Sequence, residues 1–359
     1  MKTTAIPTPS GVRQSNFELL RILCMLLIIC EHLCNFHSKA IPLDATLLGI
    51  IKNLCVCTVN CFIILSGFFS IKFKPERVLH LILQTFIYTV TIYGITLGLG
   101  WHTLSPQRDI LYLFPVFSNI YWFISVYIIL YFLSPYLNKI CLHLSKHQFK
   151  AVLTIGFLLF YVWPTLAFLV NAAQIVSDAG YGVINFTYLY LLGRYFKLHA
   201  QFTHRASYYF AGYVGISLLL FGIQKGISTL LGFSFGSLHS YNTVFVFFAA
   251  IALFVFFSKI SLQSSLINTL AKSCIAVFLI HCGPHIWYGF CGNVLQFQDY
   301  HGISMLPILF LAPLGIYLAC HFIEQVRSLL FSGLEKVIIQ KVNQLKPVQQ
   351  LMQHYQSLS

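Results

Sequence analysis

The apolar residues of this chain form long runs separated by short polar breaks, beginning near residue 19 and ending near residue 326. Most runs approach about 20 residues, the length that an α-helix needs to cross the ~30 Å hydrocarbon core of a bilayer. The pattern predicts an all-α, polytopic membrane bundle of about ten transmembrane helices. The expected helices are 19–37, 46–71, 77–99, 119–138, 149–169, 183–198, 206–224, 240–259, 269–291 and 303–326.

Polar segments flank this predicted membrane domain, which extends over residues 19–326. Residues 1–18 are polar and contain proline, and no small-residue cleavage pattern follows, so we expect a cytosolic tail and a retained first helix. Residues 327–359 are mildly amphipathic and are expected to lie along the inner membrane surface as a cytosolic tail. The outer breaks are too short to hold a folded extracellular domain, which excludes receptor ectodomains.

Lysine and arginine residues indicate how this bundle is oriented. Ten spans put both termini on one side, and placing them in the cytosol assigns 18 of the 22 Lys and Arg residues to inner segments. Only Lys39, Lys52, Arg108 and Lys225 remain outside. The formal net charge of +13 is then explained by loops that face anionic lipid headgroups, so we expect no nucleic-acid partner.

The composition agrees with a membrane protein, because 58% of the residues are hydrophobic and only 9% are charged. Most of the eleven cysteines lie within apolar runs, where a free cysteine behaves as a small hydrophobic residue. Cys55, Cys57 and Cys61 lack the spacing and the histidine partners of a zinc site. The sequence therefore predicts neither a metal site nor a disulfide framework.

The first apolar run, RILCMLLIICEHLCNF, carries three ionisable side chains, Arg21, Glu31 and His32. Such side chains are costly inside a bilayer, so each is a candidate site residue. Arg21 and His32 are eleven residues apart, which places them about 20° apart around a helix and ~16 Å apart along it. His32 is the candidate general base, because histidine can accept and return a proton near neutral pH. We expect a group on another helix to orient its ring, because adjacent residues on a helix do not face each other.

Each of these three residues also has a purely structural explanation. Arg21 could anchor the helix at the interface by extending its charged end toward water. His32 could bridge two helices. Glu31 is turned some 80–100° away from His32 and could contact another neighbour or the outer headgroup layer, which we expect as its default position.

Three further segments contain candidate residues. In FIILSGFFSIKFKPERVLHLILQTF, Arg77 and His80 share one helix face beside a basic loop and could hold the phosphates of a nucleotide-like donor. Trp122 in NIYWF is either an aromatic anchor at the membrane interface or part of an acceptor site or pore. His281 in AKSCIAVFLIHCGPH lies about halfway along its predicted helix, either as a packed polar residue or as a pore-lining one.

These segments together resemble the acyltransferase 3 family of integral membrane O-acyltransferases, which modify bacterial surface polysaccharides and related glycans. The resemblance covers about residues 16–325 and depends on the order of several short motifs. They are N-x-x-L-L-R-I from Asn16 to Ile22, a histidine (His32) eleven residues after Arg21, S-G-F-F with a basic loop from Ser66 to Arg77, W-F followed by L-S-P from Trp122 to Pro135, and S-x-x-x-x-F-L-I-H from Ser273 to His281.

The resemblance implies a ten-helix bundle that delivers an acyl group to a hydroxyl of a glycan or lipid-linked sugar, commonly acetyl from acetyl-CoA in the cytosol. It implies that His32 is the catalytic histidine and Arg21 its companion. The family's R-x-x-R motif would contact the CoA donor, but here it reads Arg77-Val-Leu-His80, without the second arginine. The resemblance supplies no reason for Glu31.

The resemblance also implies that the protein lies in the bacterial cytoplasmic membrane. It implies acyl-CoA as a co-substrate without a tightly bound cofactor, and a glycan acceptor and lipid as partners.

Two other functions fit the same residues. A transporter or flippase for a polysaccharide or sugar lipid could use Glu31, His32 and His281 as a polar path for protons or substrate. A structural membrane subunit of a polysaccharide assembly complex would need none of these side chains.

Overall fold

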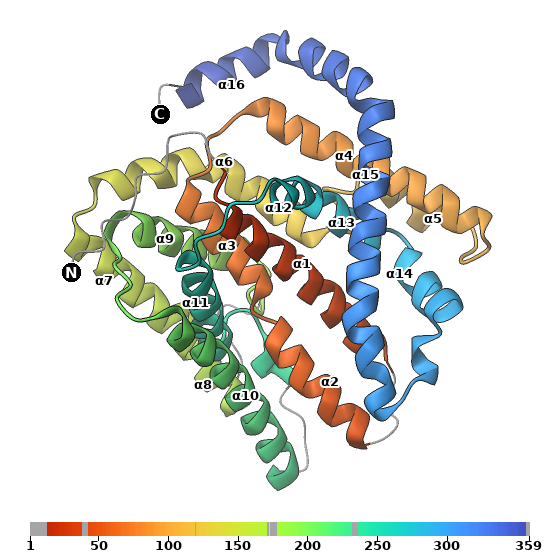
Figure 1. The fold of residues 1–359 in the computed structure, drawn as a ribbon. Coiled ribbons are helices and arrows are strands. Elements are labelled where there is room, and N and C mark those ends of the chain that lie inside the picture. The colour runs from red at the N-terminus through yellow and green to blue at the C-terminus, as the bar shows by residue number, and fades with distance from the viewer. Residues whose placement is uncertain are drawn as a thin grey trace.

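The computed structural model describes residues 13–37, 42–118, 120–170, 172, 178–231 and 236–356, and in these residues all regular secondary structure is helical (Figure 1). The all-α prediction is therefore confirmed. Most of the predicted N-terminal tail, residues 1–12, lies outside the described residues.

The α-helices are α1 (Ser15–Phe36), α2 (Pro42–Cys55), α3 (Thr58–Phe69), α4 (Pro75–Gly98), α5 (Pro106–Asp109), α6 (Trp122–His143), α7 (Lys146–Phe157), α8 (Trp163–Leu169), α9 (Val183–His199), α10 (Ala206–Leu231), α11 (Val244–Ser258), α12 (Ser265–Leu270), α13 (Cys274–His281), α14 (Ile286–Gly289), α15 (Met305–Asn343) and α16 (Lys346–Gln356). Short 3₁₀ segments lie at Ile110–Leu113, Gly236–His239, Ala271–Ser273, Phe297–Asp299 and Gly302–Ser304, and π-helical turns at Leu158–Val162 and Phe290–Leu295.

Each of the ten predicted ranges overlaps one or more helices, but helix length and apolar composition identify fewer spans. Among the described residues, six helices are long and apolar enough to cross a membrane, and a seventh is added if one bent pair counts as a span. Val244–Ser258 is a shorter apolar helix. The chain is therefore a multi-pass membrane protein by these criteria, while the count of ten and the cytosolic position of both termini stay predictions.

The predicted helix 269–291 is divided in the structure by a sharp bend. Ser265–His281 and Ile286–Leu295 meet at an angle of 84°. Pro284 lies in the break and has no N–H to continue a helix, and His285 has a left-handed backbone with φ of 58°. His281 is therefore the last residue of α13 rather than the middle of a straight helix.

The last long helix extends beyond its predicted end at residue 326. α15 continues to Asn343, and α16 follows after a short turn. Near the end of α16, Tyr355 stacks on Phe73 with ring centroids 4.0 Å apart and donates a hydrogen bond to the Phe132 carbonyl. The C-terminal segment is thus packed against α6 and the loop before α4.

Helix α1 lies at the centre of the bundle and contacts α2, α3, α11, α13 and α15 (Figure 1). A very close helix contact lies next to it, between α3 and α9. A Cβ atom on Gly67 would lie 2.1 Å from the Tyr190 carbonyl oxygen, and one on Gly193 would lie 2.2 Å from that of Ile64. Only glycine allows two helix backbones to approach this closely.

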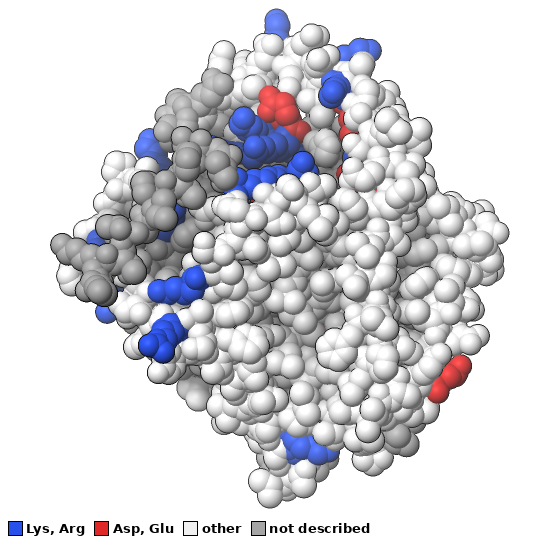
Figure 2. Space-filling view, viewed as in Figure 1, with Lys and Arg blue, Asp and Glu red and all other residues white. Residues whose placement is uncertain are grey.

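Charged side chains are unevenly distributed over the surface. Figure 2 shows most of the visible Lys and Arg residues in the upper and left parts of this face, toward the end of the bundle where α1 begins in Figure 1. The centre of the face is white, with one acidic patch at its lower right edge and one basic patch at the bottom (Figure 2). This uncharged surface is what a helix bundle presents to lipid.

Candidate active site

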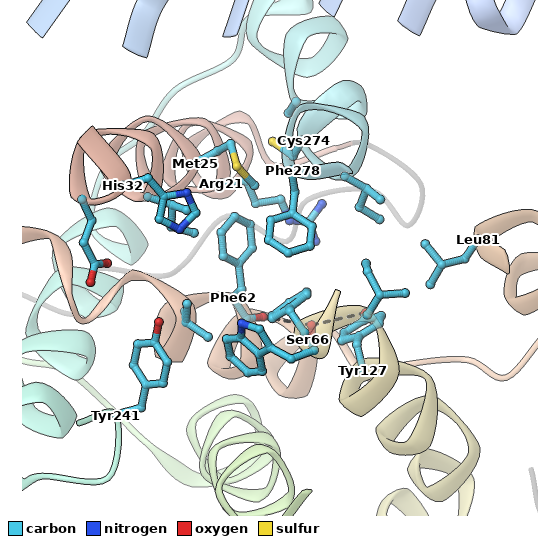
Figure 3. A pocket seen from close by; sticks show the side chains of 18 of the residues that line it. Arg21, Met25, His32, Phe62, Ser66, Leu81, Tyr127, Tyr241, Cys274 and Phe278 are labelled. Carbon is cyan, nitrogen blue, oxygen red and sulfur yellow. Dashed lines mark hydrogen bonds between the residues drawn. The ribbon is translucent and has the colours of Figure 1, made fainter. Parts of the chain in front are cut away.

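A cavity of about 400 Å³ runs beside α1. Its wall includes side chains from α1, α3, α4, α6 and α13, from the 3₁₀ turn at Ala271–Ser273, and from the turns that precede α9 and α11. Figure 3 shows Arg21, Met25 and His32 on α1 facing Phe62 and Ser66 on α3 across this cavity. The ionisable residues of α1 line this cavity, which is therefore the candidate active site.

One stripe of α1 forms a whole side of the cavity. Its residues are Glu18, Arg21, Met25, Ile28, His32 and Asn35. The steps between them alternate between three and four residues, which keeps all six on one helix face. Glu31, although it lies beside His32 in the sequence, also lines the cavity. The predicted common face of Arg21 and His32 is thus the face that the cavity occupies.

Basic side chains surround the cavity at the end where α1 begins. Arg13, Arg21 and Lys272 line it together with one acidic residue, Glu18. The Arg21 guanidinium donates to both carboxylate oxygens of Glu18 at 3.2 Å, and Arg13 lies 3.9 Å from the same carboxylate. Three cations and one anion leave an excess of two positive charges, which favours an anionic ligand at this end.

The middle of the cavity is mainly apolar. Phe62 and Phe278 bring aromatic rings to it, and Met25 comes from α1 (Figure 3). Ile28 of α1 also lines the cavity. Ser66 is the main polar group here and lies 3.5 Å from the Tyr127 hydroxyl. A slender, largely apolar chain would fit this section better than a charged group.

His32 is held by a histidine from another helix. The Nδ1 atom of His281 lies 2.6 Å from the Val277 carbonyl oxygen, which can only accept, so Nδ1 carries the proton and Nε2 of neutral His281 is an acceptor. His32 Nδ1 lies 3.2 Å from that Nε2 and must therefore donate to it. The lone pair of neutral His32 is then on Nε2, which makes no hydrogen bond to any residue that the structure describes.

Cys282 belongs to the same cluster. Its sulfur lies 3.3 Å from His281 Nε2 and 3.7 Å from His32 Nδ1. One donor atom from each of these three side chains lies within 4.8 Å of the others, a spacing that could also hold a metal ion. His281 is buried behind His32 and does not line the cavity, so His32 is the member that a substrate could touch.

Aromatic residues surround the other end of the cavity. The ring centroid of Trp122 lies 4.6 Å from that of Tyr181 and 5.9 Å from that of Tyr241, and the two tyrosine rings are 4.8 Å apart. The carboxylate of Glu31 and the amide of Asn35 line the same region. Flat rings next to acceptor and amide groups suit a ligand with both C–H faces and hydroxyls.

Hydrogen bonds in the loops fix these aromatic side chains. The Tyr241 N–H donates to the Ala179 carbonyl at 3.0 Å, which joins the turns before α9 and α11. The buried Asn60 side chain donates to the Tyr241 carbonyl at 2.9 Å. Tyr121, next to Trp122, donates its hydroxyl to the Leu279 carbonyl and so fastens the start of α6 to α13.

Comparison with known protein families gives one finding. The acyltransferase 3 family model, described as an acyltransferase domain, matches residues 14–324. The chain belongs to the acyltransferase 3 family. The match includes every α1 residue of the cavity, and membership supports a membrane acyltransferase. Comparisons with curated proteins and with solved structures give no match.

The structure places the predicted site residues of this acyltransferase 3 family member in two groups. Arg21, Glu31, His32 and Trp122 line the cavity, and His281 contacts His32 from behind. Glu31 therefore lines the cavity, and its expected position at the level of the outer headgroups stays a prediction.

Arg77 and His80 do not line the cavity. His80 Nε2 lies 3.5 Å from one Glu335 carboxylate oxygen, and the other oxygen of that carboxylate accepts from Arg327, so this histidine is part of a contact between α4 and α15. Arg77 is exposed one helical turn before Leu81, which does line the cavity. Arg77 thus lies beyond the cavity wall on the same side of α4.

Sequence reasoning missed several cavity residues of this family member. Glu18 could have been found, because it lies three residues before Arg21 on the predicted common face. Lys272 belongs to the segment AKSCIAVFLIHCGPH, in which only His281 is a predicted site residue. Tyr181 lies in a predicted polar break and Tyr241 at the start of the predicted helix 240–259, and no local pattern indicates that their rings come together.

Proposed function

We propose that this protein transfers an acyl group, most simply acetyl from acetyl-CoA, to a hydroxyl of a surface glycan or lipid-linked sugar at the bacterial cytoplasmic membrane. The observation that carries this proposal is a single cavity with a basic end, a histidine whose lone pair is available, and an aromatic end. Family membership supports the acyl transfer itself. The donor and the acceptor are inferred from the chemistry of the two ends, and the membrane location from the apolar helices and the family.

The basic end suits the phosphates of a CoA donor. Arg13, Arg21 and Lys272 supply cationic side chains there, and guanidinium groups bind phosphate oxygens with strong charge-assisted hydrogen bonds. Arg21 and His32 are ~16 Å apart along α1, a distance comparable to an extended pantetheine arm. The apolar middle of the cavity would hold that arm, so the thioester would come next to His32. Arg77 would contact only a part of the donor that extends beyond the cavity.

His32 would act as the general base. Its Nε2 would accept the proton of an acceptor hydroxyl while the oxygen attacks the thioester carbonyl carbon. The new C–O ester bond forms as the C–S bond breaks, and the leaving CoA thiolate takes the proton back from His32. His281 would stabilise the protonated His32, because His32 Nδ1–H keeps its acceptor throughout.

The aromatic end suits a sugar acceptor. The C–H face of a pyranose ring packs well against an aromatic ring, and its hydroxyls need acceptors such as Glu31 and Asn35. The acceptor would therefore enter on the side opposite to the donor. This arrangement gives Glu31 a role as an acceptor-binding residue.

Purified protein in detergent or nanodiscs, supplied with acetyl-CoA and extracted glycan, tests this proposal. We expect release of free CoA and a glycan heavier by one acetyl group, both abolished in His32→Ala. The His32→Ala variant should insert and unfold like the wild type, and the exposed His147→Ala on α7 serves as the matched control. Retained acylation in His32→Ala contradicts the role of His32, and a transporter would release no CoA at all.

A further inference from the structure

A second group of histidine and carboxylate side chains lies beyond the C-terminal end of α1. His37 follows α1, Asp44 is in the first turn of α2, and His301 precedes the 3₁₀ turn that leads into α15. One nitrogen of each histidine and one Asp44 oxygen lie within 4.8 Å of one another. His37 is 4% exposed and Asp44 is fully buried, whereas the His301 side chain is 44% exposed and opens the group to solvent.

The hydrogen bonds of His37 determine which of its nitrogens is free. His37 Nε2 lies 2.7 Å from the Tyr300 carbonyl oxygen, and because a carbonyl can only accept, Nε2 carries the proton. The lone pair of the neutral ring is then on Nδ1. This atom is buried and has no hydrogen-bond partner among the described residues. A buried acceptor without a donor is costly, and such an atom calls for an explanation.

Histidine ligands of metal ions commonly have this arrangement. One ring nitrogen donates to a backbone carbonyl, which fixes the tautomer, and the other nitrogen points its lone pair at the ion. Asp44 is held in a similar way, since its Oδ1 accepts from the Gly302 N–H at 2.7 Å and its Oδ2 is 2.7 Å from His301 Nδ1. A buried carboxylate also favours a nearby cation.

We propose that His37, Asp44 and His301 bind a divalent transition-metal ion, with Zn²⁺ as the best fit. Two histidines and one carboxylate are a ligand set that zinc uses, and water on the side of His301 would complete a tetrahedron. On binding, the proton that His301 Nδ1 shares with Asp44 passes to water, the neutral ring keeps its one proton on Nε2, and the Nδ1 lone pair binds the ion. The ion would fasten the ends of three segments, α1, α2 and the turn before α15, five residues beyond His32.

Spacing in the sequence gave no sign of this site. His37 and Asp44 are close in sequence, but His301 is more than 250 residues further on, and zinc motifs are recognised by short spacings. The sequence predicts no metal site anywhere in the chain, on the spacing of Cys55, Cys57 and Cys61 alone, and this proposal departs from that prediction. The proposal concerns a site apart from the cavity and does not depend on the acyl-transfer chemistry.

Zinc titration of the purified full-length protein, after treatment with a chelator, tests the proposal by calorimetry. We expect one Zn²⁺ per chain and a higher unfolding temperature with zinc. Affinity should fall by about tenfold or more in His301→Ala and in His37→Ala, because each removes a ligand. Co²⁺ provides a second readout, since visible absorption bands of a tetrahedral site should appear in the wild type and be lost in both variants.

Two controls separate this site from others. His147→Ala removes an exposed histidine on α7 and should bind zinc like the wild type. Cys282→Ser removes a donor from the cluster around His32, the other group with metal-ligand spacing among the described residues, and should also leave binding intact. His301 is half-exposed, so its variant is expected to fold even if His37→Ala does not. Binding that survives in His301→Ala, or that is lost in Cys282→Ser, overturns the proposal.

Discussion

His281, 249 residues further along the chain, determines which ring nitrogen of His32 carries the proton. Because the Val277 carbonyl fixes the tautomer of His281, His281 Nε2 can only accept, and His32 Nδ1 must donate. His281→Phe keeps a ring of similar volume but removes the acceptor. We expect kcat to fall by about 10²-fold, the lower range for loss of general-base function, with little change in the KM for acetyl-CoA.

A positioning role for His281 also predicts a changed pH profile. Without its acceptor, the His32 imidazolium loses a stabilising partner and forms only at lower pH, so the acidic limb of kcat should move to lower pH than in the wild type. A simple packing role would reduce the amount of folded enzyme and leave this limb in place. His285→Phe, which alters another histidine of the same bend, is the matched control and should keep the wild-type profile.

Trp122 should matter for the acceptor and not for the donor. Its ring is close to those of Tyr181 and Tyr241 at the cavity end opposite to Arg21. In Trp122→Ala we expect the KM for the glycan to rise about tenfold, the equivalent of about 1.4 kcal/mol of stacking and burial, while the KM for acetyl-CoA stays constant.

Trp163→Ala is the comparison for Trp122→Ala. Trp163 lies on α8, is 52% exposed and does not line the cavity, so its removal should leave both KM values unchanged. If Trp122→Ala and Trp163→Ala change the KM values equally, Trp122 is an aromatic anchor at the membrane interface and does not bind the acceptor.

At the scale of helices, the contact between α3 and α9 depends on two glycines. Added methyl groups on Gly67 or Gly193 would meet backbone carbonyls, which cannot move without shifting a helix. We expect Gly67→Ala and Gly193→Ala each to lower the free energy of unfolding by about 1–3 kcal/mol, measured by thermal unfolding in detergent. Gly215→Ala on α10, where nothing lies within 4 Å of the added Cβ, should be neutral or stabilising because alanine favours helix.

The sequence predicts local features of this bundle well and features that depend on long-range packing poorly. The stripe of α1 is a local property, so the spacing of Arg21 and His32 suffices to place both on the cavity side. The 84° bend depends on Pro284, whose presence in an apolar run permits either a kink or a break. The pairing of His281 with His32 follows from that bend and from packing between segments 249 residues apart, which no local pattern encodes.

At the scale of the whole molecule, the distribution of charge and the direction of the cavity both predict which end of α1 faces the cytosol. The basic end of the cavity must face the cytosol if acetyl-CoA is the donor, and this end lies where α1 begins. The positive-inside rule independently puts the same end of α1 in the cytosol, because 18 of the 22 Lys and Arg residues then lie inside.

Epitope accessibility in intact spheroplasts checks that orientation in the full-length protein. An epitope inserted after Ser105, in the turn between α4 and α5, should bind antibody without permeabilisation, since this turn is predicted to lie outside. An epitope at the C-terminus, after α16, should become accessible only when the membrane is permeabilised. The reverse pattern would put Arg13, Arg21 and Lys272 on the side without acetyl-CoA. The acyl donor would then have to be a molecule available outside the cell, even if His32 and its neighbours perform the same transfer.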